Sequence, residues 1–257
     1  MRERTLVKDL AASQDGPVTL GGWVDKVRDQ KRIQFVILRD ETGDVQVTYP
    51  RPVIGDAPDE NDALADPISP IADDTSIDKR LDWRFLDIRR SEMNLVFRVQ
   101  TTIEAAWRDY WRENGFVEIH SPKLMASPSE SNAELFKLEY FEGHAYLAQS
   151  PQFYKQMAVM SGLGRIFEIG PVFRADPSFT SRHATEFVSV DIEVSWIDSH
   201  EDIMAIQEQL MTRMIKTVKD AHGEEIKRLF DVDIVVPSIP FPRIPLAEAV
   251  EIVKQRG

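Results

Sequence analysis

Two neighbouring stretches of the chain, residues 165–174 and 187–196, carry charged or aromatic side chains at alternate positions. Alternate residues of a β-strand point to the same face, so each stretch predicts a strand with one polar and one apolar face. The polar faces together form a surface that we call the charged front: Glu168, Gly170, Arg174, Phe187, Ser189, Asp191, Glu193 and Ser195. The stretches therefore predict a hairpin with an apolar back on a core and a charged front on the other side.

The charged front suits a ligand that has a polyphosphate group and an aromatic base. A guanidinium forks onto phosphate oxygens, an aromatic ring stacks on a base, and carboxylates hold Mg²⁺ or an amino group. The connection between the strands adds Arg182 and His183, which places cations at the open end of an acidic surface. A surface hairpin with a solvated, salt-bridged face would show the same pattern, so the pattern alone leaves both interpretations open.

The elements before this hairpin supply further polar side chains. A predicted helix at 149–162 carries Gln152 and Lys155, which are three residues apart and therefore share a face. A lysine there can pair with a substrate carboxylate, although an isolated lysine on a helix is more often exposed to solvent. Glu130 lies in a polar loop, 125–133, where a glutamate taken alone is usually a solvated charge as well.

Other helices are predicted on both sides of the hairpin. Apolar residues recur with a period of 3.6 over 94–112, and Gly115 gives a C-cap signal after that helix. A second helix is predicted at 199–222, with His222 as an exposed residue at its end. A third, short helix is predicted at 246–254.

Three of these stretches match known sequence signatures. FRADPSFTSRHATEF resembles the FRxE…RHxxEF pattern that is motif 2 of the class II aminoacyl-tRNA synthetases, and QSPQFYKQ resembles a segment typical of their aspartyl-type members. The predicted helix at 94–112 and the strand FVEIHSPKL resemble motif 1, which implies a homodimer through that surface. The resemblance implies an α+β fold, in which an N-terminal OB-fold barrel precedes a class II antiparallel sheet flanked by helices.

The resemblance also implies roles for residues of the hairpin in a reaction of ATP with L-aspartate. Arg174 would bridge the α-phosphate and the attacking carboxylate, and Asp176, where the family usually has glutamate, would contact ATP. Arg182 and His183 would hold the outer phosphates, and Phe187 would stack on the adenine. The implied reaction forms aspartyl-adenylate and then transfers aspartate to tRNA(Asp) or, in non-discriminating members, also to tRNA(Asn).

Three residues match the aspartate-binding positions of the family: Glu130, Gln152 and Lys155. The choice of aspartate over asparagine depends on charge. Lys155 offers a partner to the β-carboxylate of aspartate, and an amide in its place would leave the lysine unpaired. The pair of glycines that usually follows the loop glutamate is replaced by Ser131 and Asn132, which reduces the backbone freedom of this loop.

The N-terminal region predicts three short strands: Val18–Val27, Ile33–Arg39 and Val45–Tyr49. The region resembles the opening of an OB-fold anticodon-binding domain, a fold that binds single strands through stacked aromatic rings and basic side chains. Phe35 is the candidate for stacking on tRNA, with Arg28 and Gln46 as contacts to phosphate or base edge. Phe35 could instead be a core residue, since its strand face also carries two isoleucines, and Trp23 is expected in the core.

Charge and composition divide the chain into three regions. The net charge is −12, but residues 1–51 hold nine Lys or Arg against eight Asp or Glu, so this region is not repelled by RNA. Residues 52–78 hold eight acidic residues and no Lys or Arg, and predict a Pro-rich linker in place of the last two strands of an OB barrel. We therefore expect a partial OB-like domain at 1–51, a linker at 52–78 and the N-terminal part of a catalytic domain at 79–257.

Composition also excludes several classes of protein. The chain has no cysteine, which excludes disulfides and thiolate metal sites. No apolar run approaches the roughly 20 residues of a membrane span, so no membrane partner is expected. The first residues lack the apolar region of a signal peptide, and a cytoplasmic location is expected.

The sequence holds no stretch like motif 3, the Gly-rich GxGxGxxR segment of the family, whose arginine contacts the terminal phosphate. The resemblance therefore implies a chain truncated before motif 3, with no metal ligand assigned in it and with the Mg²⁺ ligands in the missing part. No large inserted domain begins after motif 2, which favours the archaeal and eukaryotic-like subgroup. Two other functions stay open: a catalytically incomplete fragment or paralogue that binds tRNA or a partner, and a ligase related to asparagine synthetase.

Overall fold

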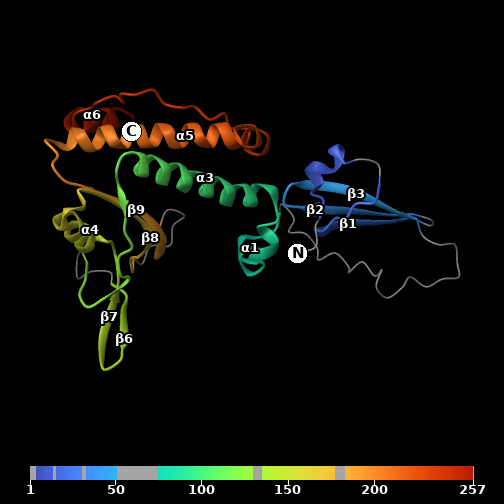
Figure 1. Cartoon of the computed structure of the whole chain (residues 1–257), viewed down its shortest axis with the longest axis horizontal. Coiled ribbons are helices and arrows are strands. Elements are labelled where there is room, and N and C mark those ends of the chain that lie inside the picture. Colours follow the sequence, from blue (N-terminus) through green and yellow to red (C-terminus); the bar gives the residue numbers. More distant parts are fainter. Residues whose placement is uncertain are drawn as a thin grey trace. The chain divides into compact units, whose positions relative to one another are not determined.

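The computed structural model describes residues 4–13, 16–30, 33–50, 74–129, 135–176 and 183–256 (Figure 1). The chain forms two compact units, residues 1–94 and 95–257. The first unit is built around a three-stranded sheet, and the second combines two small sheets with long helices. The α+β fold expected from the sequence is confirmed.

The first unit contains an antiparallel sheet in the order β1-β2-β3. Its sheet and the short 3₁₀ helix before it have these bounds: η1 (Val7–Ala12), β1 (Trp23–Gln30), β2 (Ile33–Asp40) and β3 (Gly43–Pro50). The predicted second and third strands are confirmed with small changes at their ends. The first strand was expected from Val18, and this is wrong, because β1 joins the ladder only where Trp23 pairs with Arg39.

Gly22 lets the chain pass very close to β2 just before this ladder begins. A Cβ atom at Gly22 would lie 2.2 Å from the carbonyl oxygen of Arg39. We expect Gly22→Ala to destabilise the first unit by about 1–3 kcal/mol, because the backbone of β2 must shift to make room. Urea unfolding followed by circular dichroism measures this loss. Gly43→Ala is the control, since its Cβ would meet only the Val7 side chain, at 3.4 Å, and equal losses in the two variants would contradict the steric explanation.

Trp23 is not a core residue, contrary to the expectation from the sequence. Its side chain is 44% exposed, and the guanidinium carbon of Arg89 lies 5.3 Å from its ring centroid, which is a cation–π contact. Because Trp23 is the first residue of β1, its ring lies at the end of the ladder and packs against Arg89 instead of beneath the sheet.

A buried carboxylate organises the two short helices near the end of the first unit, α1 (Ile77–Asp82) and α2 (Arg84–Asp87). The side chain of Asp87 is fully buried and accepts hydrogen bonds from Arg84 and from Arg80 Nε, the latter at 2.8 Å. Burial alone would raise the pKa of Asp87, but the guanidinium groups of Arg80 and Arg84 outweigh it and hold this pKa below the usual 3.8.

We expect Asp87→Asn to destabilise the protein by about 2–3 kcal/mol at pH 7, because the two arginines lose their anionic partner. A carboxyl with a lowered folded-state pKa contributes its full stability above its ordinary pKa, and this contribution is lost as the pH falls through the folded-state value. Urea unfolding of both proteins at pH 7 and near pH 3 should therefore show a difference that shrinks in acid. A difference that is independent of pH would show that the ion pair is not its source.

The second unit is built around a main sheet with the order β4-β8-β9, in which β4 runs parallel and β9 antiparallel to β8. The elements from α3 onward have these bounds: α3 (Ser91–Glu113), β4 (Val117–Glu118), β5 (Leu124–Met125), β6 (Lys137–Tyr140), β7 (Gly143–Leu147), α4 (Gln152–Ala158), the π-helix η3 (Val159–Leu163), β8 (Arg165–Phe173), β9 (Glu186–Val194), α5 (His200–Phe230) and α6 (Leu246–Arg256). Helices α3 and α5 lie side by side on the apolar back of this sheet (Figure 1).

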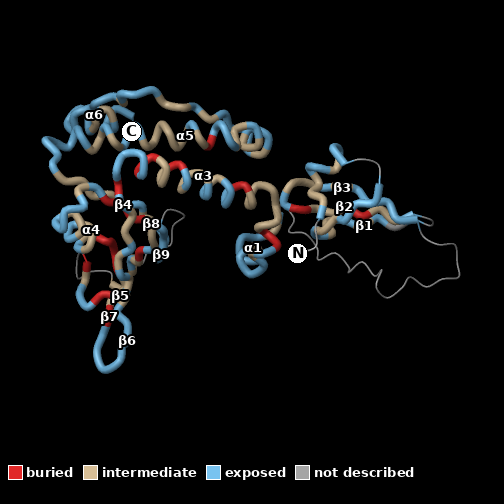
Figure 2. Tube along the Cα trace, viewed as in Figure 1, coloured by how far each residue is buried: buried red, intermediate tan, exposed pale blue. Residues whose placement is uncertain are grey.

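The apolar back of the main sheet forms the core of the second unit. Trp111 on α3 is fully buried, and its ring centroid lies 4.4 Å from that of Phe167 on β8. Tyr110 and Phe116 are buried beside them. Partly buried residues of α3, both strands and α5 complete the cluster: Trp107, Ile169, Ile192, Val194, Ile206 and Leu210. Buried positions recur along α3 and in the strands (Figure 2). The predicted apolar back is confirmed for the strand residues of this cluster, whereas Val188 and Trp196, expected on the same back, are 54% and 98% exposed.

The helices differ from their predicted bounds at several ends. The predicted helix at 149–162 is divided into α4 and η3, and Gly115 follows α3 with a φ of 75°, as the C-cap signal predicts. Helix α5 continues to Phe230, and His222 is not an exposed end residue, since its Nε2 lies 2.8 Å from Thr102 Oγ1 on α3. No helix among the described residues is both long and apolar enough to cross a membrane.

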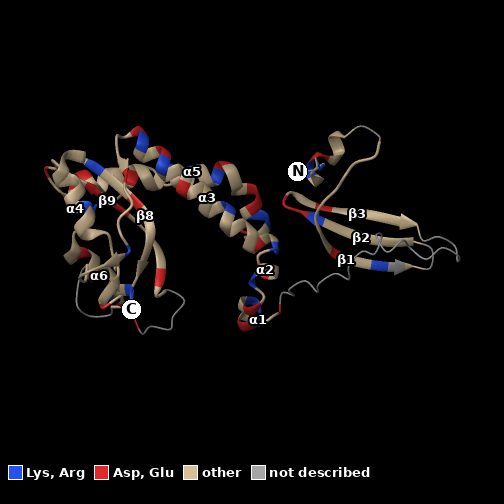
Figure 3. Ribbon diagram, turned by 60° about the horizontal axis from the view of Figure 1, so that its bottom comes forward, with Lys and Arg blue, Asp and Glu red and all other residues tan. Residues whose placement is uncertain are grey.

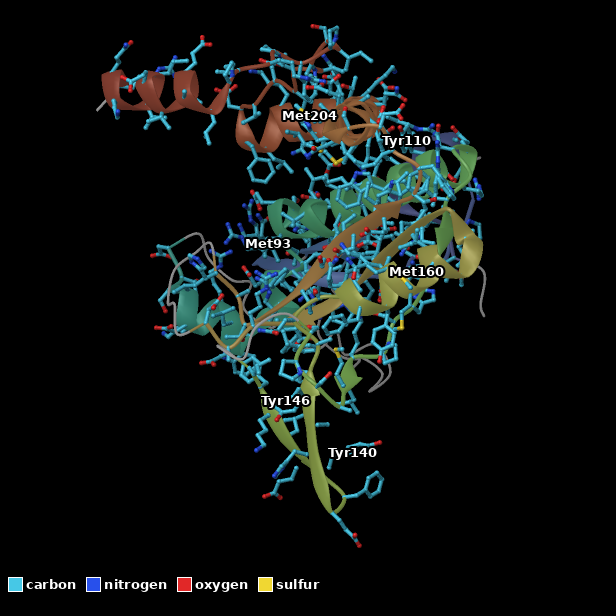
Figure 4. All side chains as sticks on the ribbon, turned by 90° about the vertical axis from the view of Figure 1, so that its left-hand side faces the viewer. Met93, Tyr110, Tyr140, Tyr146, Met160 and Met204 are labelled. Atoms are coloured by element: carbon cyan, nitrogen blue, oxygen red, sulfur yellow. The ribbon has the colours of Figure 1, made fainter. Side chains whose placement is uncertain are left out.

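The second sheet has the order β5-β7-β6 and projects from the unit as a hairpin (Figure 4). Tyr140 lies close to its tip and is 48% exposed, and Phe141 is 91% exposed with a φ of 51°. The two rings contact each other edge to face at 4.6 Å. The tip of this hairpin is exposed to solvent, whereas its base beside β5 includes the buried Ala145.

Candidate active site

The pairing of β8 with β9 assembles the charged front as the alternation predicts. Glu168 is paired with Asp191 and Gly170 with Ser189, so these four residues share one face of the sheet. Ser189 Oγ donates a hydrogen bond to Asp191 Oδ2 at 2.6 Å. Acidic and basic residues lie along these strands and the helices beside them (Figure 3).

Lys155 reaches this front from α4. Its Nζ lies 3.2 Å from Asp191 Oδ1 and 3.5 Å from Glu193 Oε2, and its side chain is 13% exposed. The interpretation of Lys155 as a solvent-facing lysine is therefore wrong. A mostly buried ammonium beside two carboxylates forms a site of both signs, which suits a ligand that itself carries both an amino group and a carboxylate.

Arg174 and Phe187 lie together at the end of the hairpin. The guanidinium carbon of Arg174 is 5.8 Å from the ring centroid of Phe187, and the backbone N–H of Arg174 donates to the carbonyl oxygen of Thr185 at 2.9 Å. Both side chains are exposed, Phe187 to 38%. The pair thus presents a guanidinium to a phosphate and a ring face to a base.

The remaining predicted ATP contacts are less well defined. Asp176 and His183 lie in the connection between β8 and β9, and Asp176 is half-buried whereas His183 is exposed. Arg182, in that connection, and Glu130, in the loop after β5, fall outside the described residues. Their roles stay predictions.

The polar loop at 125–133 contains a buried serine that no sequence pattern singles out. Ser129 is 3% exposed, and its Oγ accepts hydrogen bonds from the N–H groups of Gln149 at 3.0 Å and Ser150 at 3.3 Å. Ser150 Oγ in turn accepts from the N–H of Gln152 at 3.3 Å. These bonds tie Ser129 to the residues that lead into α4.

The carboxylates of the charged front are engaged by protein cations. Within the described parts of the chain, no group of three or more His, Cys, Asp or Glu side chains is arranged to hold a metal ion. Asp191 and Glu193 are paired with Lys155 instead. The residues described here therefore do not offer a ready Mg²⁺ site.

In the first unit, the three candidate nucleic-acid contacts share one face of the sheet. Phe35 is paired with Arg28 across β1 and β2, and Ile37 is paired with Gln46 across β2 and β3. Arg28 and Gln46 are exposed and Phe35 is half-buried, whereas Val36, on the opposite face, is 3% exposed. Phe35 thus lies on the face away from the core residue Val36, between Arg28 and Thr48 on the neighbouring strands and beside the two isoleucines of its own strand. The stacking role of Phe35 stays a prediction.

Comparison with known proteins finds relatives along nearly the whole chain. The chain is 36% identical to the aspartate–tRNA(Asp/Asn) ligase of Methanopyrus kandleri, over 97% of this chain and 67% of that protein. It is 34% identical to the aspartate–tRNA(Asp) ligase of Pyrococcus abyssi, over 93% of this chain and 64% of that protein. The chain spans about two thirds of the length of these relatives.

A solved structure shows the same fold. The asparaginyl-tRNA synthetase from Pyrococcus horikoshii, complexed with asparaginyl-adenylate, is similar with a TM-score of 0.88 at 30% sequence identity. The similarity covers 100% of this chain and 68% of that one.

Two families match the chain itself. Residues 18–70 match the OB-fold nucleic acid binding domain, which includes the sheet of the first unit. Residues 76–256, the greater part of the chain and all of the charged front, match the class II tRNA synthetases (D, K and N). The chain belongs to the class II tRNA synthetases of the D, K and N group.

Proposed function

We propose that this chain carries the amino-acid-activating site of an aspartate–tRNA ligase, in which L-aspartate and ATP form aspartyl-adenylate before transfer to tRNA. The observation that carries the proposal is Lys155, a mostly buried cation held between Asp191 and Glu193 on the hairpin that ends in Arg174 and Phe187. The match to an OB-fold at the N-terminus favours a tRNA substrate over a ligase of small molecules alone.

The first step needs positioning and charge neutralisation more than proton transfer. A carboxylate oxygen of aspartate attacks the α-phosphorus of ATP, and pyrophosphate leaves. In this proposal Arg174 bridges the α-phosphate and the attacking carboxylate, and Phe187 stacks on the adenine. Asp176 contacts ATP, while His183 and Arg182 hold its outer phosphates. Class II synthetases use Mg²⁺ with ATP, and the ion, when bound, neutralises phosphate charge.

The amino acid occupies the site of both signs on the charged front. Lys155 pairs with the β-carboxylate, whereas the neutral amide of asparagine offers no negative charge to its ammonium. Gln152 and Glu130 complete the contacts to the substrate. The names of the relatives include tRNA(Asp) and tRNA(Asn), and we propose tRNA(Asp) as the acceptor, with tRNA(Asn) as a second acceptor to be tested.

Aspartate-dependent ATP–pyrophosphate exchange on this polypeptide tests the proposal directly. We expect exchange with aspartate and little with asparagine or lysine. Aspartylation of tRNA(Asp) and tRNA(Asn) transcripts then identifies the acceptor. A folded protein that binds tRNA but gives no exchange with any of the three amino acids would contradict the ligase function and leave a tRNA-binding fragment or paralogue.

The first unit is proposed to bind the tRNA through Phe35, Arg28 and Gln46. We expect Phe35→Ala to weaken binding of a tRNA(Asp) transcript by about 10- to 100-fold, because a stacked base contributes about 1–3 kcal/mol. Fluorescence anisotropy with labelled tRNA measures the affinity. Phe141→Ala, which removes the exposed phenylalanine of the β6–β7 hairpin, is the matched control. Equal affinity of the two variants would place the RNA contact away from Phe35.

We also propose the domain limits and the assembly that the sequence implies. The linker at 52–78 separates a partial OB-like domain at 1–51 from the catalytic part at 79–257. The OB-fold match ends at residue 70 and the synthetase match begins at residue 76, both within this range. A cytoplasmic homodimer through α3 agrees with the exposure of two of its apolar side chains, Val96 (50%) and Phe97 (43%). Sedimentation velocity measures the assembly state.

A further inference from the structure

A second ion pair lies on the charged front, and neither the proposed mechanism nor the sequence pattern uses it. Lys123, just before β5, places its Nζ 2.7 Å from Glu168 Oε1 and 3.0 Å from Ser121 Oγ. Glu168 is 3% exposed, and the same oxygen accepts the N–H of Ser121 at 3.1 Å. Its Oε2 is buried and has no hydrogen-bond partner in the described part of the chain.

Glu168 stands directly beside the proposed aspartate site. It is the cross-strand partner of Asp191. The carboxylate of Asp191 forms an ion pair with Lys155. Like charges directly opposite each other on a sheet repel, because their Cβ atoms are only about 5 Å apart. The pairing is tolerated because each carboxylate has its own lysine: Lys123 neutralises Glu168, and Lys155 neutralises Asp191.

The space above Gly170 brings the two ion pairs close to each other. A Cβ atom at Gly170 would lie 3.4 Å from Lys123 Nζ and 3.2 Å from Glu168 Oε1, so the ammonium of Lys123 lies over Gly170, within contact distance of such a side chain. Gly170 is paired with Ser189, whose hydroxyl donates to Asp191. The flexible four-carbon stem of a lysine could carry its ammonium from Glu168 to the neighbouring carboxylate of Asp191.

We propose that Glu168 is a positioning residue that holds Lys123 away from Asp191 and so leaves Lys155 as the cation of the aspartate site. Without the charge of Glu168, Lys123 is an uncompensated ammonium next to Asp191 and takes this carboxylate from Lys155. Lys155 then loses the position from which it meets the substrate. The effect on aspartate rests on the proposed function of this site, whereas the exchange of lysine partners does not.

Two variants of the full chain distinguish a role of Glu168 in positioning Lys123 from a role in stabilising the fold alone. Glu168→Gln keeps the shape but removes the charge, and it should raise the KM for aspartate in pyrophosphate exchange by about tenfold or more, with a smaller change in kcat. Adding Lys123→Met removes the competing cation and should return the KM to near the wild-type value. If the double variant is no better than Glu168→Gln, the pair only braces the fold and the proposal is wrong.

A second readout needs no catalysis. The rate of reductive methylation of each lysine, measured by mass spectrometry, reports how strongly its ammonium is held. Lys155 should react severalfold faster in Glu168→Gln than in the wild type and return to the wild-type rate in the double variant. Glu251→Gln, which breaks the exposed ion pair with Lys254, is the matched control and should leave Lys155 unchanged.

The two readouts also separate this proposal from the proposed function. If the wild-type chain gives no exchange but Lys155 reacts faster in Glu168→Gln, the ligase function fails and the positioning by Glu168 stands. If exchange proceeds and Lys155 reacts at the same rate in both proteins, the ligase function stands and the positioning by Glu168 is overturned.

Discussion

Replacing Arg174 by alanine is expected to lower the rate of aspartate-dependent ATP–pyrophosphate exchange by about 10²–10³-fold. The guanidinium is proposed to neutralise the charge that develops when the carboxylate attacks the α-phosphate, so its loss should reduce kcat more than it raises the KM for aspartate. Because Arg174 follows β8 and is exposed, alanine removes its charge and its contact with Phe187 without opening a cavity in the core.

Arg165→Ala is the matched control for this variant. Arg165 starts the same strand, is exposed, and also lies over an aromatic ring, that of Phe116, at 5.8 Å. Its removal should change exchange by no more than about twofold, as expected for a surface substitution. Equal losses in Arg165→Ala and Arg174→Ala would mean that β8 as a whole is disturbed, and the assignment of Arg174 to the phosphate would fail.

Lys155→Met is expected to raise the KM for aspartate by about 10²–10³-fold and to remove the preference for aspartate over asparagine. Methionine keeps an unbranched, flexible side chain and loses the charge. The β-carboxylate of the substrate then has no cation to meet, and Asp191 and Glu193 add two uncompensated negative charges to the site. Both effects weaken the binding of an anion more than that of the neutral amide.

The measurement is exchange kinetics as a function of aspartate and asparagine concentration. Lys216→Met, which removes an exposed lysine paired with Asp220 on α5, controls for the loss of one positive charge from the protein. An unchanged KM for aspartate in Lys155→Met would place the β-carboxylate elsewhere. A parallel rise in the KM for aspartate and the KM for asparagine, with the preference retained, would mean that Lys155 contacts the α-amino or α-carboxylate part that both amino acids share.

The shared face of the two strands that form the charged front could be predicted from the sequence, but the pairing of its charges could not. The spacing of Gln152 and Lys155 is local, and the alternation along the two strands assigns the faces correctly. The partners of Lys155 depend on how α4 packs against the sheet, which no local pattern encodes. The pair of Lys123 and Glu168 is equally hidden, because 45 residues separate its members and β5 is only two residues long.

The errors in predicting the ends of strands and helices also come from tertiary contacts. The prediction of a strand from Val18 is wrong because Gly22 passes against the backbone of β2 before the ladder begins. The local sequence around Val18 holds no information about this contact with another strand. Helix α5 continues through Gly223, although glycine disfavours helix, because contacts with α3 hold the later turns. These contacts include the ion pair of Arg98 with Glu225 at 2.6 Å.

The register of β8 and β9 limits how this site can change in evolution. The strand repeat is two residues, so a slip by one residue would turn Glu168 and Asp191 into the aromatic core and expose Phe167 and Ile192. A single insertion within either strand would therefore remove the site and the core together. Changes of length in the connection between the strands cost little chain entropy and leave the pairing intact. Changes in the proposed contacts to the ATP phosphates are thus far more accessible in evolution than changes in the strands that hold the charges.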